Sequence, residues 1–313
     1  MILALAGGVG GARLACGLAR ALQPAEFAIA VNVGDDFEHL GLHVSPDLDT
    51  VMYTLAGLHN PVAGWGRSDE TWNFMETLAI LGGETWFRLG DRDLAVHVER
   101  TRRMAAGETL SQVTESLCRR LGIGALVMPV TDDRLRTMVL TSEGELSFQH
   151  YFVRLRCEPR VSGFRFDGAQ DARLSAPLAT LIGSSRITGV VLCPSNPWLS
   201  IAPMRAVAAL EEFLAARRVP VVAVSPIVGG AAVKGPAAKI MRELGREPSA
   251  LEVVRHYGAS VDGWLIDRVD ATLAAQIEVM GRRVHVADTM MTDEGRSLAV
   301  AREALALLRG LSP

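Results

Sequence analysis

Four carboxylates stand close together near the amino terminus, as the pairs Asp35/Asp36 and Asp47/Asp49. Carboxylate oxygens are hard ligands that suit Mg²⁺, particularly beside phosphate oxygens. Helix capping is the alternative role, because Ser45 or Asp47 stands where a cap for the following helix is expected. Four carboxylates exceed what one cap requires, so we predict a Mg²⁺ site in this acidic segment.

A glycine-rich turn precedes the acidic segment. The sequence GGVGG at 7–11 follows an apolar strand and leads into a helix, an arrangement that brings backbone N–H groups close to a bound phosphate. Gly8 and Gly10 match the first two glycines of the dinucleotide fingerprint, but Arg13 stands at the third position, which disfavours NAD. No Gly-Lys-Ser/Thr follows, so the turn is not a Walker A loop. We predict that Gly8, Gly10 and Gly11 bind phosphate.

Two later loops carry compatible chemistry. Ser195 and Asn196 lie between prolines in the sequence CPSNP, and Ser225 and Lys234 lie in the glycine-rich sequence SPIVGGAAVKGP. Each loop follows a buried strand and precedes a helix, so each should open at the ligand edge of a parallel sheet. The alternatives are an ordinary proline-shaped connection and a flexible loop with a solvated lysine. Because the three loops together form a constellation, we predict that these four side chains bind a nucleotide or its phosphates.

The rhythm of strands and helices must bring these loops together. Apolar strands are predicted at 1–6, 27–33, 125–129, 189–193, 219–224, 263–266 and 283–287. Helices are predicted at 12–22, 51–56, 101–121, 201–217, 236–244, 251–256, 271–280 and 297–308. Strands that alternate with helices are typical of an α/β protein with a Rossmann-like, doubly wound and mostly parallel sheet. Phosphate-binding groups and carboxylates should then meet at one edge, beyond the carboxyl ends of the strands.

We predict a single α/β domain over residues 1–313, with two additions to the main sheet. The first is a helical insertion at about 58–100, which holds Trp65, Trp72 and Trp86. These tryptophans either fill a small core within the insertion or form a cover that offers a stacking face to the ligand. The second is an excursion at about 136–177. Its predicted parts are a hairpin formed by 136–140 and 146–152, and an irregular polar stretch at 156–177.

Composition restricts the class of protein. The chain has 313 residues, of which 49% are hydrophobic, and a formal net charge of -3. These values are typical of a globular protein, and without a basic tract we expect no nucleic-acid partner. Four scattered cysteines without a CxxC pair predict neither a zinc site nor a disulfide framework. Met1 leads directly into a strand, so we expect no signal peptide, no membrane span and a cytoplasmic location.

Several segments together resemble one known family, the 2-phospho-L-lactate transferases of coenzyme F420 biosynthesis. The SPDLDT sequence at 45–50 and the SPI and KGPAAK sequences at 225–227 and 234–239 are the specific ones. The other matching segments are AGGVGGA at 6–12, VNVGDD at 31–36, LGDRD at 89–93, PSNP at 194–197 and DTMM at 288–291. The resemblance extends over almost the whole chain.

This resemblance implies a reaction and a set of residues. The family transfers a phospho-acid moiety from a GDP-linked diphosphate donor to the ribityl hydroxyl of the deazaflavin Fo, releases GMP and requires Mg²⁺. Its members are homodimers with a Rossmann-like sheet. Asp49 matches the aspartate that contacts Fo, and Arg88 stands where a basic Fo-contacting residue precedes Leu-Gly-Asp.

The resemblance and the residues together predict a division of roles. Some of Asp35, Asp36 and Asp47 hold Mg²⁺, while the glycine turn and Lys234 steady the phosphates. Asp49, with Asp47 beside it, is the predicted catalytic group that orients or deprotonates the attacking hydroxyl.

Three questions stay open at the level of sequence. Another nucleotide- or NAD-dependent Rossmann-type enzyme is the alternative on the same fold, since a fold does not determine function. A nucleotide sensor without catalytic activity is a further one. The sequence also does not distinguish phospholactate, phosphoenolpyruvate and phosphoglycerate as the acid that is transferred.

Overall fold

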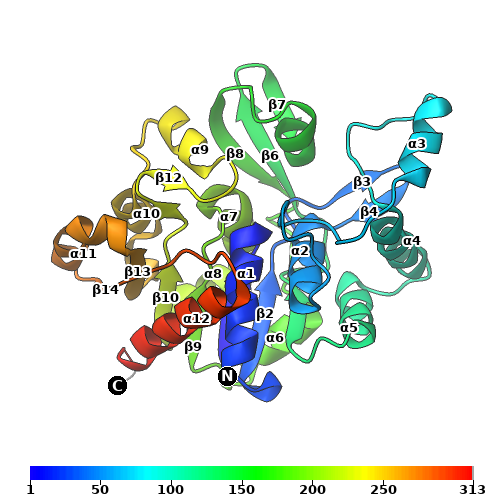
Figure 1. Cartoon of the computed structure of the whole chain (residues 1–313). Coiled ribbons are helices and arrows are strands. Elements are labelled where there is room, and N and C mark those ends of the chain that lie inside the picture. Colours follow the sequence, from blue (N-terminus) through cyan, green and yellow to red (C-terminus); the bar gives the residue numbers. More distant parts are fainter. Residues whose placement is uncertain (312–313) are drawn as a thin grey trace.

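A computed structural model of the chain describes residues 1–311, in which one parallel sheet forms the centre (Figure 1). Its seven strands have the order β14-β13-β10-β9-β1-β2-β5. The strands are β1 Ile2–Ala6, β2 Phe27–Val31, β5 Leu126–Pro129, β9 Gly189–Leu192, β10 Val221–Val224, β13 Gly263–Asp267 and β14 Arg283–Ala287. The prediction of a Rossmann-like, doubly wound α/β fold is confirmed.

The direction of winding reverses between β1 and β9. From β1 the chain continues to β2 and β5 on one side, whereas β9, β10, β13 and β14 follow one another on the other side. In doubly wound sheets the crevice for ligands lies outside the carboxyl ends of the strands at such a reversal. The fold therefore places the turn after β1 beside the loop after β9.

Three helices pack on one another in front of the sheet, with α1 (Gly8–Ala21) in contact with both α2 (Pro46–Leu55) and α12 (Glu294–Arg309) (Figure 1). A Cβ atom on Gly17 of α1 would collide with the carbonyl of Ser297 in α12. Glycine is therefore required where these two helices cross closely.

The segment between β2 and β5 is longer and more irregular than one crossover helix. It contains the antiparallel hairpin β3 Phe37–His39 and β4 Leu42–Val44, followed by α3 Asn73–Ile80, α4 Asp91–Ala105 and α5 Leu110–Arg120. The prediction of one surface helix at 101–121 is wrong. The chain breaks at Gly107, which has a φ of 95°, and Thr109 caps α5 by accepting a hydrogen bond from the Gln112 N–H. The apolar face of α5 is buried against β5.

A second, smaller sheet of order β7-β6-β8 stands at the top of the molecule in Figure 1. Its strands are β6 Arg136–Thr141, β7 Gly144–Ser147 and β8 Val161–Asp167. The predicted hairpin exists, but its second strand ends at Ser147 and a π-helical turn follows at His150–Arg154. The prediction that 156–177 is irregular is wrong, because β8 pairs with the free edge of β6.

The remaining elements are helices and one two-stranded sheet, β11-β12. They are α6 Ala176–Gly183, α7 Ala202–Arg205, α8 Ala208–Ala215, β11 Ile227–Val228, β12 Ala231–Ala232, α9 Ala237–Glu243, α10 Ala250–Tyr257 and α11 Ala274–Val279. The helix predicted at 201–217 is divided into α7 and α8, because Val207 has extended backbone angles between them. The first three residues of the helix predicted at 271–280 belong to a 3-10 helix, Arg268–Leu273, and α11 begins at Ala274.

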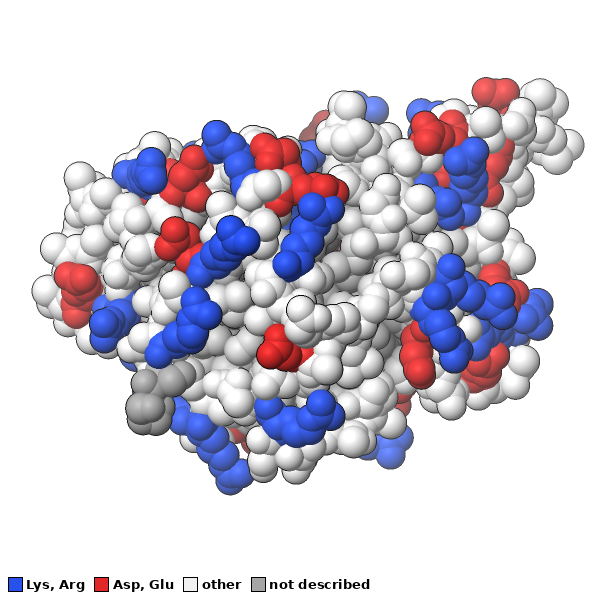
Figure 2. Space-filling view, turned by 60° about the horizontal axis from the view of Figure 1, so that its bottom comes forward, with Lys and Arg blue, Asp and Glu red and all other residues white. Residues whose placement is uncertain are grey.

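The surface carries mixed charge. On the face shown in Figure 2, basic and acidic side chains lie next to one another, in keeping with exposed ion pairs such as Arg102–Glu99 and Arg20–Glu294. Within residues 1–311, the helices all lack the combination of length and apolar character needed to cross a membrane.

Candidate active site

The glycine turn and the CPSNP loop meet at the reversal of the sheet. The N–H of Gly7 donates a hydrogen bond of 2.9 Å to the Ser195 hydroxyl, which is buried. Helix α1 begins at Gly8, with a φ of 64°, rather than at residue 12 as predicted, so the glycines form its first turn. A Cβ on Gly10 would come within 2.5 Å of the Pro194 carbonyl oxygen. Glycine is thus required both for the backbone angle and for close packing of the helix end on this loop.

Asp47 joins the glycine turn to the acidic segment. It stands in the first turn of α2 and accepts a 2.6 Å hydrogen bond from the Gly8 N–H. Its other oxygen accepts from the side-chain amide of Asn32, which also donates to Asp35 at 3.2 Å. Asn32 is fully buried just beyond β2. One amide therefore holds two carboxylates next to the amino end of α1, where N–H groups lack intrahelical acceptors.

Asp36 is the third member of this carboxylate cluster, which we define as Asp35, Asp36 and Asp47. One Asp36 oxygen accepts from the Ser45 hydroxyl at 2.8 Å and lies 3.1 Å from Nε2 of His43. The other oxygen, Oδ1, is buried and has no hydrogen-bond partner among the described residues. Ser45 stands at the N-cap of α2, yet its hydroxyl binds Asp36 rather than capping the helix.

Electrostatics within the carboxylate cluster favour a bound cation. Burial, together with the neighbouring charges of Asp47 and Asp36, raises the pKa of Asp35 well above its usual range. Burial also raises the pKa of Asp47 to about 6, against the opposing effect of the hydrogen bonds from Asn32 and Gly8. A divalent cation would compensate the negative charges of these carboxylates and bind the unpartnered oxygen of Asp36. The donor set, hard carboxylate oxygens, is the kind that Mg²⁺ binds.

Asp49 faces a different neighbour, although it lies only two residues beyond Asp47. Both of its oxygens form ion pairs and hydrogen bonds with the guanidinium of Arg100 on α4, which is fully buried. Burial disfavours a charged guanidinium, but the Asp49 carboxylate outweighs it and raises the pKa of Arg100. Asp49 is itself buried, so this ion pair also joins α2 to α4.

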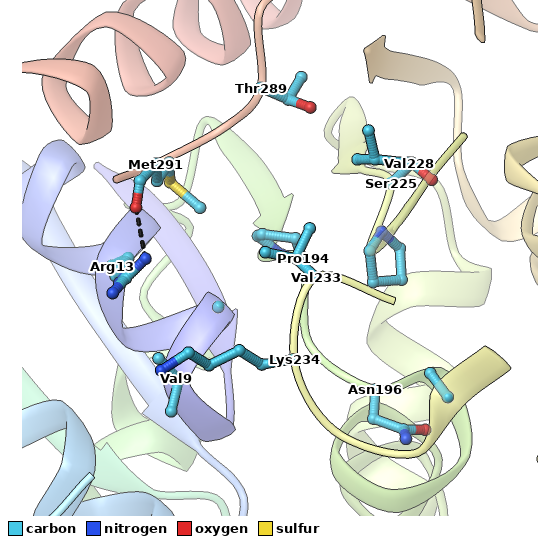
Figure 3. Close-up of a pocket in the computed structure, with 13 residues that line it drawn as sticks. Val9, Arg13, Pro194, Asn196, Ser225, Val228, Val233, Lys234, Thr289 and Met291 are labelled. Atoms are coloured by element: carbon cyan, nitrogen blue, oxygen red, sulfur yellow. Dashed lines mark hydrogen bonds between the residues drawn. The ribbon is translucent and has the colours of Figure 1, made fainter. Parts of the chain in front are cut away.

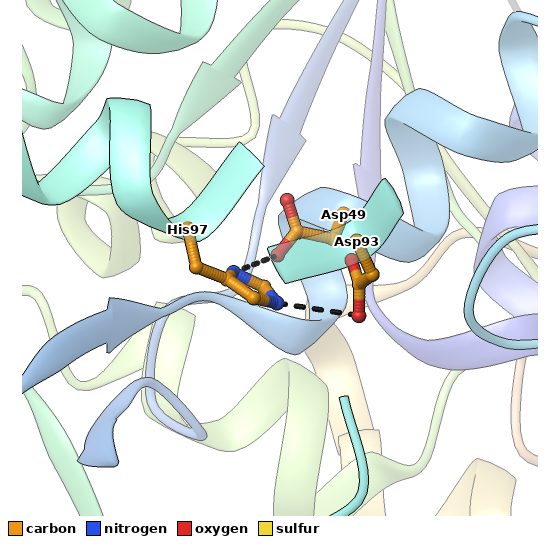
Figure 4. A group of neighbouring side chains, drawn as sticks. All are labelled: Asp49, Asp93 and His97. Carbon is orange, nitrogen blue, oxygen red and sulfur yellow. Dashed lines mark ion pairs between the residues drawn. The ribbon is translucent and has the colours of Figure 1, made fainter. Parts of the chain in front are cut away.

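Two further residues of α4 extend this contact (Figure 4). Nδ1 of His97 lies 3.7 Å from Asp49, and its Nε2 lies 3.2 Å from Asp93. The hydroxyl of Tyr53 donates to Asp93 at 2.6 Å. Ligand atoms of Asp49, Asp93 and His97 all lie within 4.8 Å of one another, the spacing of a metal site. Because Arg100 already neutralises Asp49, we interpret the group as an ion-pair network.

A cleft opens between the glycine turn and the two later loops (Figure 3). Two cations from different elements line it: Arg13 of α1 donates to the Met291 carbonyl at 2.6 Å, and Lys234 reaches across the mouth toward Val9. The Lys234 ammonium donates to the Ala63 carbonyl at 2.7 Å. Lys234 thus links the loop at 225–236 to the insertion. Its side chain lies at the cleft rather than free in solvent.

The other predicted nucleotide-binding side chains also have partners within the protein. The side chain of Asn196 lines the cleft and accepts from the N–H groups of Trp198 and Leu199. Ser225 lines the same cleft and bonds the backbone of Ile227 in its own turn. Each residue therefore has a structural role in shaping its loop, and binding of a ligand by these groups stays a prediction.

Arg88 and the three insertion tryptophans lie in different surroundings. Arg88 is exposed, and its guanidinium stacks on Trp72 at 4.1 Å from the ring centroid. Trp86 stacks on His150 of the second sheet region, with ring centroids 5.6 Å apart. Trp65 is 56% exposed. Trp86 therefore packs across to another part of the chain instead of filling a core confined to the insertion.

Three residues of this region, Asn32, Arg100 and Arg13, were not among the predicted site residues. Asn32 carries a signal, since a polar residue directly follows a strand that is apolar throughout. Arg100 also has a signal in the sequence, because Asp93, His97 and Arg100 are spaced to lie on one face of a helix. Arg13 was considered only as a mismatch to the dinucleotide fingerprint, although a cation one turn into a helix after a glycine loop is well placed to meet a phosphate.

Comparisons with known proteins show the family of this chain. A model of the family described as 2-phospho-L-lactate transferase CofD matches residues 2–304. A phosphoenolpyruvate transferase from Streptomyces griseus is 45% identical over 312 residues, covering 98% of this chain and 98% of that protein. A phosphoenolpyruvate transferase from Thermobifida fusca is 40% identical over 321 residues, covering 98% and 97%. A solved structure of a UPF0052 family protein from Bacillus halodurans has a TM-score of 0.62 at 13% identity, covering 97% and 98%, and supports the fold alone.

The sheet, the cleft at its reversal and the adjacent carboxylates define an α/β enzyme of the Rossmann-like class. The chain belongs to the 2-phospho-L-lactate transferase family. It is a transferase that moves a phospho-acid group in the biosynthesis of coenzyme F420, and the alternative of an NAD-dependent enzyme is not favoured.

Proposed function

We propose that this enzyme transfers the phosphoenolpyruvate moiety of a GDP-linked donor to the ribityl hydroxyl of Fo and releases GMP. The observation that carries the choice of acid is the agreement of relatives that cover nearly the whole chain and are named phosphoenolpyruvate transferase. The cleft supports the choice of a GDP-linked diphosphate as the donor, because Arg13, Lys234 and the amino end of α1 meet there.

The reaction forms one bond and breaks another at phosphorus. The Fo hydroxyl oxygen attacks the phosphorus that bears the enolpyruvyl group, and the bond from that phosphorus to the bridging oxygen of the diphosphate breaks. The bridging oxygen leaves with GMP, and the hydroxyl proton passes to a base. We assign that base or orienting group to Asp49, with Asp47 on the donor side of the same helix turn. Positioning and charge neutralisation supply most of the catalysis in such transfers.

The carboxylate cluster is the proposed site of Mg²⁺. When bound, the ion neutralises charge on the diphosphate and on the leaving GMP. Asp35, Asp36 and Asp47 are its proposed ligands, because they converge, are buried and share excess negative charge. Asn32 holds two of these carboxylates in place by donating to both.

Replacing Lys234 with Ala should weaken GDP binding by about 1–3 kcal/mol, the range for a charge-assisted hydrogen bond. In the free protein the ammonium donates to the Ala63 carbonyl, and we expect it to exchange this partner for a diphosphate oxygen. Isothermal titration with GDP measures the effect. Lys239→Ala is the matched control, because this second lysine donates to the Pro159 carbonyl and to Glu243 instead. Equal GDP affinity in the wild type and Lys234→Ala would assign Lys234 to the loop contact alone.

The proposed reaction is tested by supplying Fo with GDP-linked phosphoenolpyruvate, phospholactate or phosphoglycerate in separate assays. Mass spectrometry should detect GMP and the dehydro form of F420-0 with the first donor, at a kcat/KM above those of the other two. A higher kcat/KM with phospholactate would instead give F420-0 and overturn the choice of acid. Absence of any product with all three donors would refute the proposed reaction and favour a nucleotide sensor.

We also propose that the enzyme works as a cytoplasmic homodimer. The family resemblance supports this, and so does the exposure of large apolar side chains at the end of α3, where Ile80 is 86% and Leu81 is 78% exposed. Light scattering coupled to gel filtration should report twice the mass of the single chain.

A further inference from the structure

The network around Arg100 is unusual for a purely structural contact. Its guanidinium is completely buried and pairs with Asp49, while its Nε has no hydrogen-bond partner among the described residues. Removing two charges from water costs as much as their attraction returns in many proteins, so a buried ion pair is a weak source of stability. An apolar pair would pack α2 on α4 without this cost. The network is better explained by the fixed position that it gives to α4 relative to the Asp49 carboxylate on α2.

That geometry concerns two segments far apart in the chain. Asp49 stands in the first half of α2, whereas Arg100 is 51 residues later, in the middle of α4. Helix α4 begins at Asp91, directly after Leu89 and Gly90, which are buried. Arg88 precedes these two residues, so only two buried residues separate it from the start of α4.

Three side chains support the pair from the other side. Asp93 and His97 lie on the same face of α4 as Arg100, and His97 bridges Asp93 to the Asp49 carboxylate. Tyr53, one turn beyond Asp49 on α2, donates to Asp93. Contacts therefore cross between the two helices at three residues of α4, Asp93, His97 and Arg100, and restrict both sliding and rotation of one helix on the other.

We propose that Arg100 is a positioning residue for the acceptor side of the site. It holds the Asp49 carboxylate at a set distance from the segment that carries Arg88, and His97, Asp93 and Tyr53 brace it. This inference rests on the proposed function, because Asp49 and Arg88 are the residues assigned there to Fo. The network makes α4 of the insertion a part of the catalytic framework.

The test is Arg100→Lys, which keeps the positive charge and removes the planar fork that holds both Asp49 oxygens. We expect kcat/KM for Fo to fall by about 10- to 100-fold, because a displacement of about 1 Å in a positioning group costs up to about 10²-fold. The KM for the GDP-linked donor and the affinity for GDP should stay at the wild-type values. Arg102→Gln is the matched control on the same helix, since Arg102 is exposed and pairs only with Glu99 among the described residues.

A double variant separates positioning from general loss of structure. If Arg100 acts through Asp49, then Asp49→Asn/Arg100→Lys should be no slower than Asp49→Asn, whereas independent effects multiply. Tyr53→Phe removes only the hydroxyl that donates to Asp93, and it should lower the same kcat/KM by a smaller factor. This variant keeps the ring and provides a folded test if Arg100→Lys fails to fold.

The outcomes distinguish this inference from the proposed function. A wild type that forms no product from Fo and any donor would refute the function. With an active wild type, unchanged kcat/KM in folded Arg100→Lys would overturn the positioning role. In case that variant does not fold, unchanged kcat/KM in Tyr53→Phe would overturn it. Multiplying losses in the double variant, or an equal loss in donor KM, would overturn it as well.

Discussion

Removal of divalent metal ions with EDTA should abolish turnover, and added Mg²⁺ should restore it. The physical reason is the buried carboxylate cluster, in which burial and like charges raise the pKa of Asp35 and Asp47. A site that holds excess negative charge cannot accept a diphosphate without a compensating cation. Metal stabilisation of several kcal/mol corresponds to a rate loss of at least about 100-fold. Full activity in metal-free buffer would contradict the proposed magnesium site.

Variants can locate the metal independently of activity. Asp36→Asn and Asp47→Asn should each reduce the increase in melting temperature that Mg²⁺ produces in the wild type, because a ligand that binds less tightly stabilises the folded state less. Asp171→Asn is the matched control, since Asp171 is exposed in a turn before α6. A wild-type response to Mg²⁺ in both cluster variants would place the ion elsewhere.

Replacing Asp49 with Asn should reduce turnover by about 10²–10⁴, the range for loss of a general base. It should also destabilise the protein, because the buried guanidinium of Arg100 would lose its counter-charge. Breaking one side of a buried ion pair costs about 3–5 kcal/mol. The pairing with Arg100 is visible only in the tertiary structure, and it is the reason to expect this loss of stability. Urea unfolding and steady-state kinetics measure the two effects separately.

Turnover of Asp49→Asn must be expressed per folded molecule, at a temperature well below its melting point. GDP affinity should remain near the wild-type value, because the donor cleft is lined by other elements. Glu243→Gln is a useful comparison, since it removes the partner of Lys239 outside the carboxylate cluster and should affect stability but not turnover. If folded Asp49→Asn turned over normally, Asp49 would be a structural anchor of α4 rather than a catalytic group.

Local patterns in the sequence were sufficient for most of the fold. Runs of apolar residues such as β1 and β2 are buried on both faces, as strands of a covered parallel sheet must be. Their alternation with helices predicts the class of sheet. The errors fall where local pattern is weak. The strand β8 contains Ser162 and Gly163, and it becomes a strand by pairing with β6.

For the candidate site, too, some features follow from the sequence and others only from the tertiary structure. Its residue types and the edge at which they gather follow from the sequence, because the loops after parallel strands open on one side. The partners of each side chain do not follow. Ser45 occupies a cap position but binds Asp36, and Asp47 lies beside the glycine turn because Asn32 and Gly8 donate to it.

The sequence by itself determined the seven strands of the central sheet, the acidic segment and the family, since these depend on residue type, periodicity and local motif. Only the tertiary structure decided that Asp47 and Asp49, two residues apart, serve different neighbours. Asp47 meets the amino end of α1, whereas Asp49 meets Arg100, 51 residues away on α4. The reason is that side chains two residues apart leave a helix in different directions, and the helices packed there depend on the whole chain.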